Sequence, residues 1–215
     1  MSPSSPRTPN TEDADRSEAG QSTAGVEYAE RLQRLQGARW KSSAAVQLPF
    51  RLHVRAMKLG RCLDIGCGVG RLLRHMDEGS VGVDHNATSV AICRNRGLQA
   101  FTTSEFLTGG AAEHGTFDSM MLAHVLEHVG RDVGDSLLRD YLPYLRPGAT
   151  IVVMTPQEVG QRSDATHVRW VDHEAVVDHA QRLGLRVEKR YSFPFPRPVG
   201  RVFIYNEFVT VLRAG

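Results

Sequence analysis

The chain has 215 residues, of which 41% are hydrophobic, so it can bury the core of one sizeable domain rather than two. Its formal net charge is only +2, which disfavours binding of long nucleic acids, because such proteins usually carry a stronger basic excess. The three cysteines do not have the spacing of a disulfide framework, and no apolar run reaches the length of a membrane span, so we expect a cytoplasmic location.

The first part of the chain falls into segments of different composition. Residues 1–24 are rich in Ser, Thr, Pro, Asp and Glu, cannot bury enough surface to offset the entropy of ordering, and are predicted to be a disordered tail. Residues 25–58 are predicted to be a helical cover at the start of a domain that spans residues 25–215. From Lys41 to Arg74 there are seven Lys or Arg and a single acid, which indicates either a solvated face or a surface for an anionic ligand.

Strand-like and helix-like runs then alternate as far as Gly184, a pattern that favours a parallel, doubly wound sheet. Short apolar runs predict strands at Arg61–Ile65, Ser80–Val83, Gln99–Thr102, Phe117–Leu122 and Thr150–Met154. Helical patterns occupy Ala87–Arg96, Asp135–Leu145 and Glu174–Leu183, with further helices expected around Leu72, Leu73 and Met76 and through Leu126 and Val129.

The end of the chain breaks this alternation. Two strand-like runs, Arg186–Phe193 and Arg201–Leu212, are joined by a Pro-rich link without a helix, so they must pair antiparallel. The second run carries Tyr205 and Glu207, which are candidates for contact with a substrate or simply belong to a strand edge. We therefore predict an α/β, Rossmann-like sheet that is mostly parallel and closes with an antiparallel C-terminal hairpin strand.

A Gly-rich turn, LDIGCGVG at residues 63–70, follows the first predicted strand. Asp64 lies two residues before the first glycine, where the pyrophosphate of a dinucleotide would find a negative charge unfavourable. A ligand with a sulfonium and an amino group suits a carboxylate there. Asp84 ends the second strand, where a carboxylate can accept hydrogen bonds from both hydroxyls of a ribose.

These motifs, DIGCGVG followed by VGVDHN, resemble the first two motifs of class I S-adenosylmethionine-dependent methyltransferases, and FDSMMLAHVLEHV and YLRPGATIVVMTP resemble their fourth and fifth elements. The resemblance spans about residues 60–185. It implies S-adenosylmethionine as the cofactor, with Asp64, Gly66 and Gly68 along its methionine part and Asp84 at its ribose.

The resemblance also implies contacts for the rest of the cofactor. His85 or Asn86 would border the adenine, and Ser104 or Glu105 stands where the third motif of the family usually has an acid. Trp40 precedes the first strand and would wall the pocket, although a core aromatic is an equally open interpretation.

Three histidines and a carboxylate lie near the predicted carboxyl edge of the sheet. His124, Glu127 and His128 follow the fourth strand and would share a face if a helix starts there, while His167 follows the fifth strand. This run resembles the metal site of the small-RNA terminal 2′-O-methyltransferases, with His124 in place of a Glu, and a similar Glu-His run occurs in the ubiquinone-pathway O-methyltransferases. All four are candidate ligands of a divalent metal, magnesium or manganese, and the three histidines are candidate catalytic residues; packing roles for them remain open.

The acceptor is suggested by a broader resemblance. Trp40-Lys41, the Asp-His-Asn after the second strand, Thr-His-Val-Arg-Trp and Tyr-Ser-Phe-Pro-Phe-Pro resemble actinobacterial sugar O-methyltransferases, including the 1-O-methyltransferases of mycobacterial methylmannose polysaccharide synthesis. We predict O-methylation of a sugar hydroxyl on a small carbohydrate acceptor, an oligosaccharide or glycolipid precursor. The alternatives are a small-RNA 2′-O-methyltransferase, a quinone or phenol O-methyltransferase, and a cofactor-binding pseudoenzyme; the oligomeric state stays open.

Overall fold

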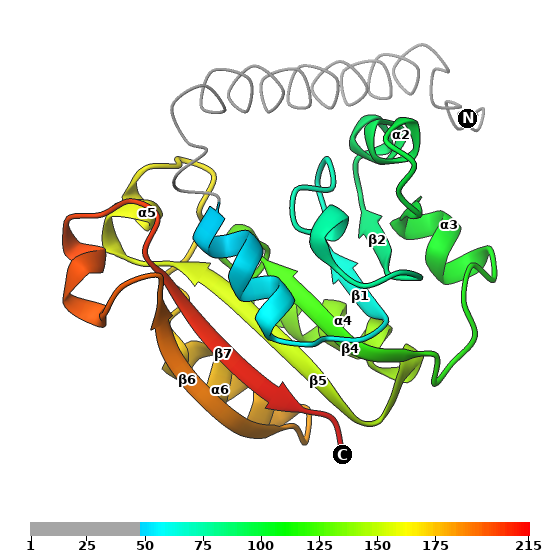
Figure 1. The fold of residues 1–215 in the computed structure, drawn as a ribbon. Helices are drawn as coiled ribbons and strands as arrows, with labels where there is room; N and C mark the ends of the chain where they lie inside the picture. Colours follow the sequence, from blue (N-terminus) through cyan, green and yellow to red (C-terminus); the bar gives the residue numbers. More distant parts are fainter. Residues whose placement is uncertain (1–47) are drawn as a thin grey trace, which may run out of the picture. The chain divides into compact units, whose positions relative to one another are not determined.

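A seven-stranded sheet organises the computed structural model, which describes residues 48–215 (Figure 1). Its strands lie in the order β3-β2-β1-β4-β5-β7-β6. All neighbours from β3 to β5 pair parallel, whereas β7 pairs antiparallel with both β5 and β6. The strands are β1 (Cys62–Ile65), β2 (Val81–Asp84), β3 (Ala100–Thr102), β4 (Phe117–Ala123), β5 (Leu145–Pro156), β6 (Arg186–Phe193) and β7 (Glu207–Arg213). The predicted fold class is confirmed.

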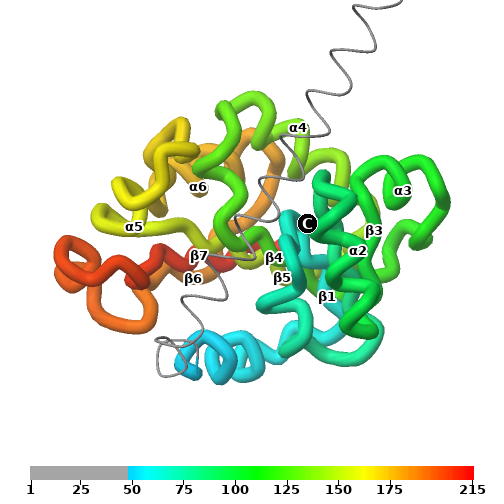
Figure 2. The backbone as a smooth tube through the Cα atoms, turned by 90° about the horizontal axis from the view of Figure 1, so that it is seen from above, coloured from blue at the N-terminus to red at the C-terminus, as the bar shows by residue number. Residues whose placement is uncertain are grey.

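Helices cover both faces of this sheet. Seen from above, α4 and α6 lie on one side, and the first described helix, residues 48–56, lies on the other (Figure 2). The helices are α2 (Ala87–Asn95), α3 (Thr103–Thr108), α4 (Arg131–Tyr141), α5 (Glu158–Arg162) and α6 (His173–Arg182), with 3-10 turns η1 (Leu73–His75), η2 (Leu126–His128), η3 (Leu142–Tyr144) and η4 (Arg197–Arg201). None of the helices in this part of the chain is both long and apolar enough to cross a bilayer.

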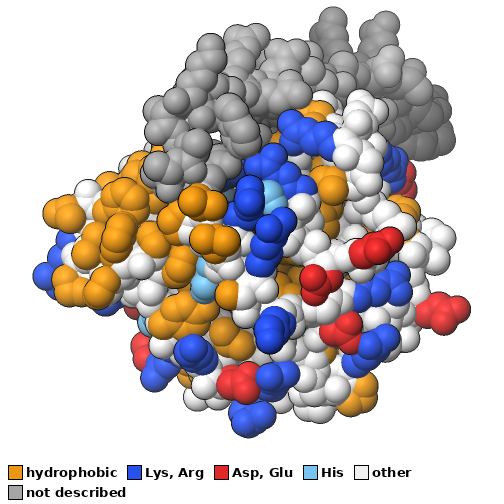
Figure 3. Space-filling model, in the orientation of Figure 1, with side chains coloured by type: hydrophobic (Ala, Val, Ile, Leu, Met, Phe, Trp, Pro, Cys, Tyr) orange, Lys and Arg blue, Asp and Glu red, His pale blue; other side chains and the backbone are white. Residues whose placement is uncertain are grey.

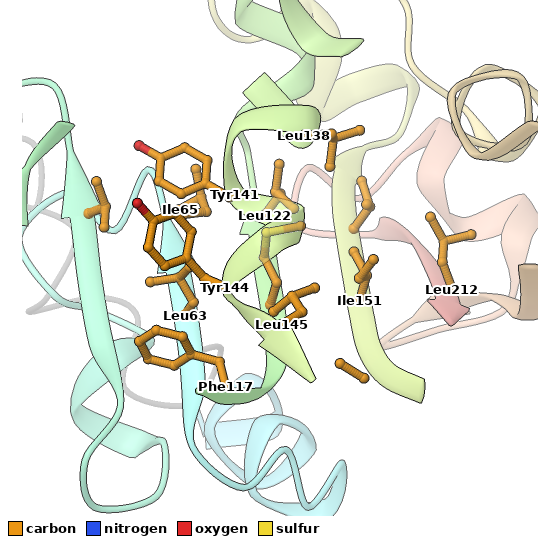
Figure 4. Close-up of a cluster of buried hydrophobic side chains, with 14 of the residues drawn as sticks. Leu63, Ile65, Phe117, Leu122, Leu138, Tyr141, Tyr144, Leu145, Ile151 and Leu212 are labelled. Atoms are coloured by element: carbon orange, nitrogen blue, oxygen red, sulfur yellow. The ribbon is translucent and has the colours of Figure 1, made fainter. Parts of the chain in front are cut away.

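The alternation of side chains along the strands supplies a core on each face. Leu63 and Leu122 point to the face covered by α4, where Tyr141 packs with them (Figure 4). Cys62 points to the opposite face, into a second cluster that contains Val54 of the first described helix. Burying each large apolar side chain contributes about 1.5–3 kcal/mol, so the parallel strands are held from both sides.

Several predicted helices differ from the observed ones in length or position. The helix expected after the Gly-rich turn is only the 3-10 turn η1. The helix predicted to end at Leu145 ends as an α-helix at Tyr141, because Pro143 lacks the N–H that would continue it. Pro147 and Gly148 do not stop a helix but lie within β5, beside an irregularity in its pairing with β4.

The final strand was placed too early by the sequence pattern. The prediction of a strand from residue 201 is wrong as far as residue 206, because β7 begins at Glu207. Residues 202–206 form turns that are held by Asn206, whose Oδ1 accepts from the Phe195 N–H at 2.9 Å. Its Nδ2 donates to Gln157 Oε1 at 3.0 Å. Side-chain hydrogen bonds thus replace the ladder that the alternation indicated.

Two short helices were not predicted, and some predictions lie outside the described residues. Thr102 begins α3 with a capping box that its spacing to Glu105 signals, and α5 follows β5 directly. The predicted tail 1–24, most of the cover 25–58, and Trp40 fall before residue 48, where the description begins. The description begins with residues 48–56, which are helical.

Candidate active site

The Gly-rich loop turns sharply at the carboxyl end of β1. The N–H groups of Gly66 and Cys67 both donate to the Val83 carbonyl, at 2.8 and 3.1 Å, which ties the loop to the end of β2. Gly66 has φ of 70°, and a Cβ there would lie 2.5 Å from Val125 Cγ2. A Cβ on Gly68, by contrast, would meet no atom of residues 48–215 within 4 Å. The loop therefore offers bare backbone to an open space.

Asp84 holds the loop to the end of β2. Its Oδ2 accepts from the Gly68 N–H and its Oδ1 from the Asn86 N–H, both at 2.8 Å. Asn86 in turn caps α2, because its Oδ1 accepts from the N–H groups of Thr88 and Ser89 in the first turn of that helix. The neighbouring His85 side chain is 82% exposed. The buried carboxylate thus orders the loop, and each oxygen keeps a lone pair for a further donor.

Asp64 is buried in β1 with an unsatisfied oxygen. The residue is 2% exposed, and its Oδ2 has no hydrogen-bond partner within the described part of the chain. Burial, followed by the nearby Cys93 and Asp84, raises the pKa of Asp64 to about 8. A buried acceptor without a donor is costly, so a ligand with a cationic donor would satisfy this carboxylate.

Ser104 and Glu105 lie in the first turn of α3. Glu105 closes the capping box, since its Oε2 accepts from the Thr102 N–H at 2.7 Å. The same oxygen pairs with Arg94 Nη2 at 2.8 Å. These contacts lower the pKa of Glu105, the backbone hydrogen bond being the largest cause. Glu105 therefore already has a structural role, and its predicted contact with adenine stays a prediction.

His124 lies between two carboxylates just after β4. It has φ of 59°, a conformation that non-glycine residues rarely adopt outside strained functional segments. Its Nε2 donates to Glu207 Oε1 at 2.8 Å and its Nδ1 to Glu127 Oε1 at 3.1 Å. Burial alone would lower the pKa of His124, but the two carboxylates outweigh it and raise it to about 10. Both ring nitrogens act as donors, so His124 in this arrangement is not available to accept a proton.

Glu127 also belongs to a second group of side chains, together with His128 and His167. Single ligand atoms of Glu127, His128 and His167 all lie within 4.8 Å of one another. His128 Nδ1 donates to the Thr166 carbonyl at 3.3 Å, and His167 Nδ1 donates to the Gln161 carbonyl at 2.9 Å. Glu127 is fully buried, and its Oε2 has no partner among the described residues.

This group has the donor chemistry of a divalent-metal site. Because both imidazoles use Nδ1 to donate to backbone carbonyls, each keeps the lone pair of Nε2, which is the arrangement that orients metal-binding histidines. The unsatisfied Glu127 oxygen adds a negative ligand. Three of the four predicted ligands are thus brought together, whereas His124 lies outside the group and instead contacts Glu127.

The local geometry differs from the predicted one. The run from His124 to His128 does not form an α-helix: His124 has a left-handed backbone conformation, and a 3-10 turn covers only Leu126–His128. Glu207 was only a weak candidate from the sequence, yet β7 places it against His124 with 6% exposure. Its Oε2 also has no partner within residues 48–215. Glu207 and His124 are 83 residues apart, and no motif around Glu207 in the sequence predicts their contact.

Comparison with known proteins identifies the family. The methyltransferase domain family matches residues 23–188, which is more than half of the chain. No curated protein matches the chain.

Solved structures of methyltransferases share the fold. A SAM-dependent methyltransferase from Archaeoglobus fulgidus is 20% identical with a TM-score of 0.56, over 76% of this chain and 94% of that one. The N-methyltransferase NodS from Bradyrhizobium japonicum WM9 is 17% identical with a TM-score of 0.59, over 80% and 98%. The magnesium protoporphyrin IX methyltransferase from Synechocystis PCC 6803, with bound SAM, is 13% identical with a TM-score of 0.54, over 79% and 82%. At these identities the likeness shows the fold and not the acceptor.

Proposed function

Because this chain belongs to the methyltransferase domain family and is an S-adenosylmethionine-dependent methyltransferase, we propose that it methylates a sugar hydroxyl at a site that Glu127, His128 and His167 prepare for a divalent ion. The observation that carries this proposal is the convergence of these three side chains, with both Nε2 lone pairs and a buried carboxylate oxygen left without a described partner. When bound, S-adenosylmethionine supplies the methyl group, and a divalent ion lowers the pKa of a nearby hydroxyl.

The cofactor would lie along the loop after β1. The open space beside Gly68 would admit the methionine part of the cofactor. The buried carboxylate of Asp64 would then face the amino group or the sulfonium of the cofactor. Asp84 accepts from the ribose hydroxyls while it keeps its two backbone hydrogen bonds. His85, Asn86, Ser104 and Glu105 remain the candidates for the adenine end.

Cofactor affinity should depend on pH through Asp64. The carboxyl with a pKa of about 8 is mostly protonated at neutral pH, and a cationic ligand requires the ionised form, so binding releases a proton. We expect affinity to rise about tenfold from about pH 6 to about pH 7, to rise about fivefold more by about pH 8, and to level off at about pH 9. Calorimetry in two buffers of different ionisation enthalpy would measure the proton release. A pH slope that persists in Asp64→Asn would contradict the assignment.

The acceptor side offers hydrogen-bond acceptors rather than an apolar wall. Glu127 and Glu207 both flank His124, and each keeps a buried oxygen without a described donor. A sugar supplies several hydroxyl donors at once, whereas a catechol supplies two on an otherwise apolar ring. His124 holds the two carboxylates apart and in fixed orientation by donating to both. The reacting hydroxyl gives up its proton to a carboxylate oxygen at this edge, because the proposed ion takes the Nε2 lone pairs of His128 and His167.

The acceptor class is tested by initial rates with three probes. Purified full-length chain, labelled S-adenosylmethionine and a divalent ion would be supplied with short manno-oligosaccharides, an RNA with a terminal diol, or a catechol. We expect label on the sugar. Label on RNA or catechol alone would contradict the sugar acceptor while leaving the methyltransferase activity intact.

A further inference from the structure

Five arginines from three separate parts of the chain gather beside the Gly-rich loop. Arg51 and Arg55 come from the first described helix, Arg71 and Arg74 follow the loop, and Arg96 follows α2. Figure 3 shows Lys and Arg side chains gathered with a His side chain over this helix and the segment after the loop. We call these five residues the arginine cluster.

The charges of the cluster act on one another. Burial lowers the pKa of Arg74, and the charges of Arg96, Arg71 and Arg51 lower it further. The sequence pattern left open whether the basic stretch is a solvated face or a ligand surface. Because the charges of arginines from three segments act on Arg74, and Figure 3 shows basic side chains gathered there, folding concentrates positive charge that a simple solvated helix would spread out.

Two contacts fix guanidinium groups within the cluster. Arg74 Nε donates to His75 Nε2 at 3.1 Å, and Arg96 Nη1 donates to the Val69 carbonyl at 2.6 Å. Burial and the neighbouring arginines lower the pKa of His75 to about 4, so at neutral pH this ring can accept the hydrogen bond. The second contact joins the cluster directly to the loop that would hold the cofactor.

Four of the five arginines have no acidic partner within the part of the chain that the structure describes. Among residues 48–215, no carboxylate forms an ion pair with Arg51, Arg55, Arg71 or Arg96. Most other arginines in the same part of the chain are paired with acids, namely Arg94, Arg131, Arg146, Arg182, Arg190, Arg197 and Arg213.

We propose that the arginine cluster binds a phosphoryl or pyrophosphoryl group carried by the acceptor, an inference that rests on the proposed sugar methylation. Guanidinium groups bind phosphate oxygens through paired hydrogen bonds, and several of them suit a dianion. The cluster is compact and the net charge of the chain is only +2, so it does not provide the long basic groove that tracks a nucleic-acid strand. The acceptor is thus a phosphorylated sugar, held beside the cofactor loop.

Direct binding of inorganic pyrophosphate tests the cluster without any turnover. Calorimetry with the full chain should show binding that weakens about tenfold or more in the double variant Arg51→Ala with Arg71→Ala. The matched control is Arg139→Ala, an exposed arginine of α4 outside the cluster, which should stay within about twofold of the unchanged protein. Equal binding by the double variant and the unchanged protein would overturn the proposal.

Two further measurements test whether the arginine cluster binds the cofactor or a nucleic acid instead of the acceptor. If the double variant loses S-adenosylmethionine affinity by the same factor, the cluster serves the cofactor and the proposal fails. If a short single-stranded oligonucleotide binds more tightly than pyrophosphate and with the same sensitivity to the variant, the proposal also fails. Methyl transfer to mannose phosphate should exceed transfer to free mannose, and only the double variant should remove the difference. Pyrophosphate binding without any sugar methylation would instead show that the proposed acceptor is wrong.

Discussion

Replacing Asp84 with Ala is expected to lower the affinity for S-adenosylmethionine by about 100-fold or more. The substitution removes the acceptor for the N–H groups of Gly68 and Asn86 as well as the proposed ribose contact. Charge-assisted hydrogen bonds contribute about 1.5–3 kcal/mol each, and each tenfold loss of affinity corresponds to about 1.4 kcal/mol, so the expected loss follows from one or two such bonds. Calorimetric titration of the purified variant measures it.

A matched control separates this effect from a general loss of charge. Asp132 is an exposed acid in the first turn of α4, and Asp132→Ala should leave cofactor affinity unchanged. Circular dichroism should show that Asp84→Ala remains folded. Unchanged affinity in a folded Asp84→Ala protein would remove the ribose assignment.

Replacing His128 and His167 together with Ala is expected to lower kcat by about 100-fold or more, while cofactor affinity stays within about twofold. The two rings supply the Nε2 lone pairs of the proposed metal site, and within residues 48–215 their hydrogen bonds go to Thr166 and Gln161 rather than to the Gly-rich loop or Asp84. Turnover with saturating cofactor and calorimetry on the same preparation would show the split between the two quantities.

The corresponding control is His114→Ala, a histidine whose ring packs edge-on against Tyr144 and which does not belong to the group of Glu127, His128 and His167. It should keep full activity. Full activity in the variant that lacks both His128 and His167 would instead contradict the metal-centred mechanism, and the two imidazoles would then only pack against each other, with ring centroids 4.7 Å apart.

The fold was predictable because its signals are local and repeated. Short apolar runs such as those around Leu63 and Ile151 indicate strands that are buried on both faces of a sheet. The Gly-rich turn directly follows β1 and Asp84 ends β2, so the sequence also indicates where these two strands end. The errors arose where single residues override a pattern: the α-helical part of α4 ends before Pro143, and Asn206 holds a loop where alternation indicated a strand.

The site was only partly predictable, for a different reason. Spacing alone suggested that His124 and Glu127 share a face, and they do make contact, but through a 3-10 turn that begins after a left-handed residue. Tertiary contacts decide the rest. The convergence of His167 with His128 depends on the loop after α5, and the ion pair of Glu207 with His124 depends on the position of β7 in the sheet.

The most direct test of the central claim is methyl transfer to the sugar acceptor before and after treatment with EDTA, followed by addition of Mg²⁺ or Mn²⁺. We predict that EDTA abolishes transfer, that one of these ions restores it, and that cofactor binding is the same in all three conditions. Transfer that continues at the full rate in EDTA would contradict a role for Glu127, His128 and His167 as metal ligands.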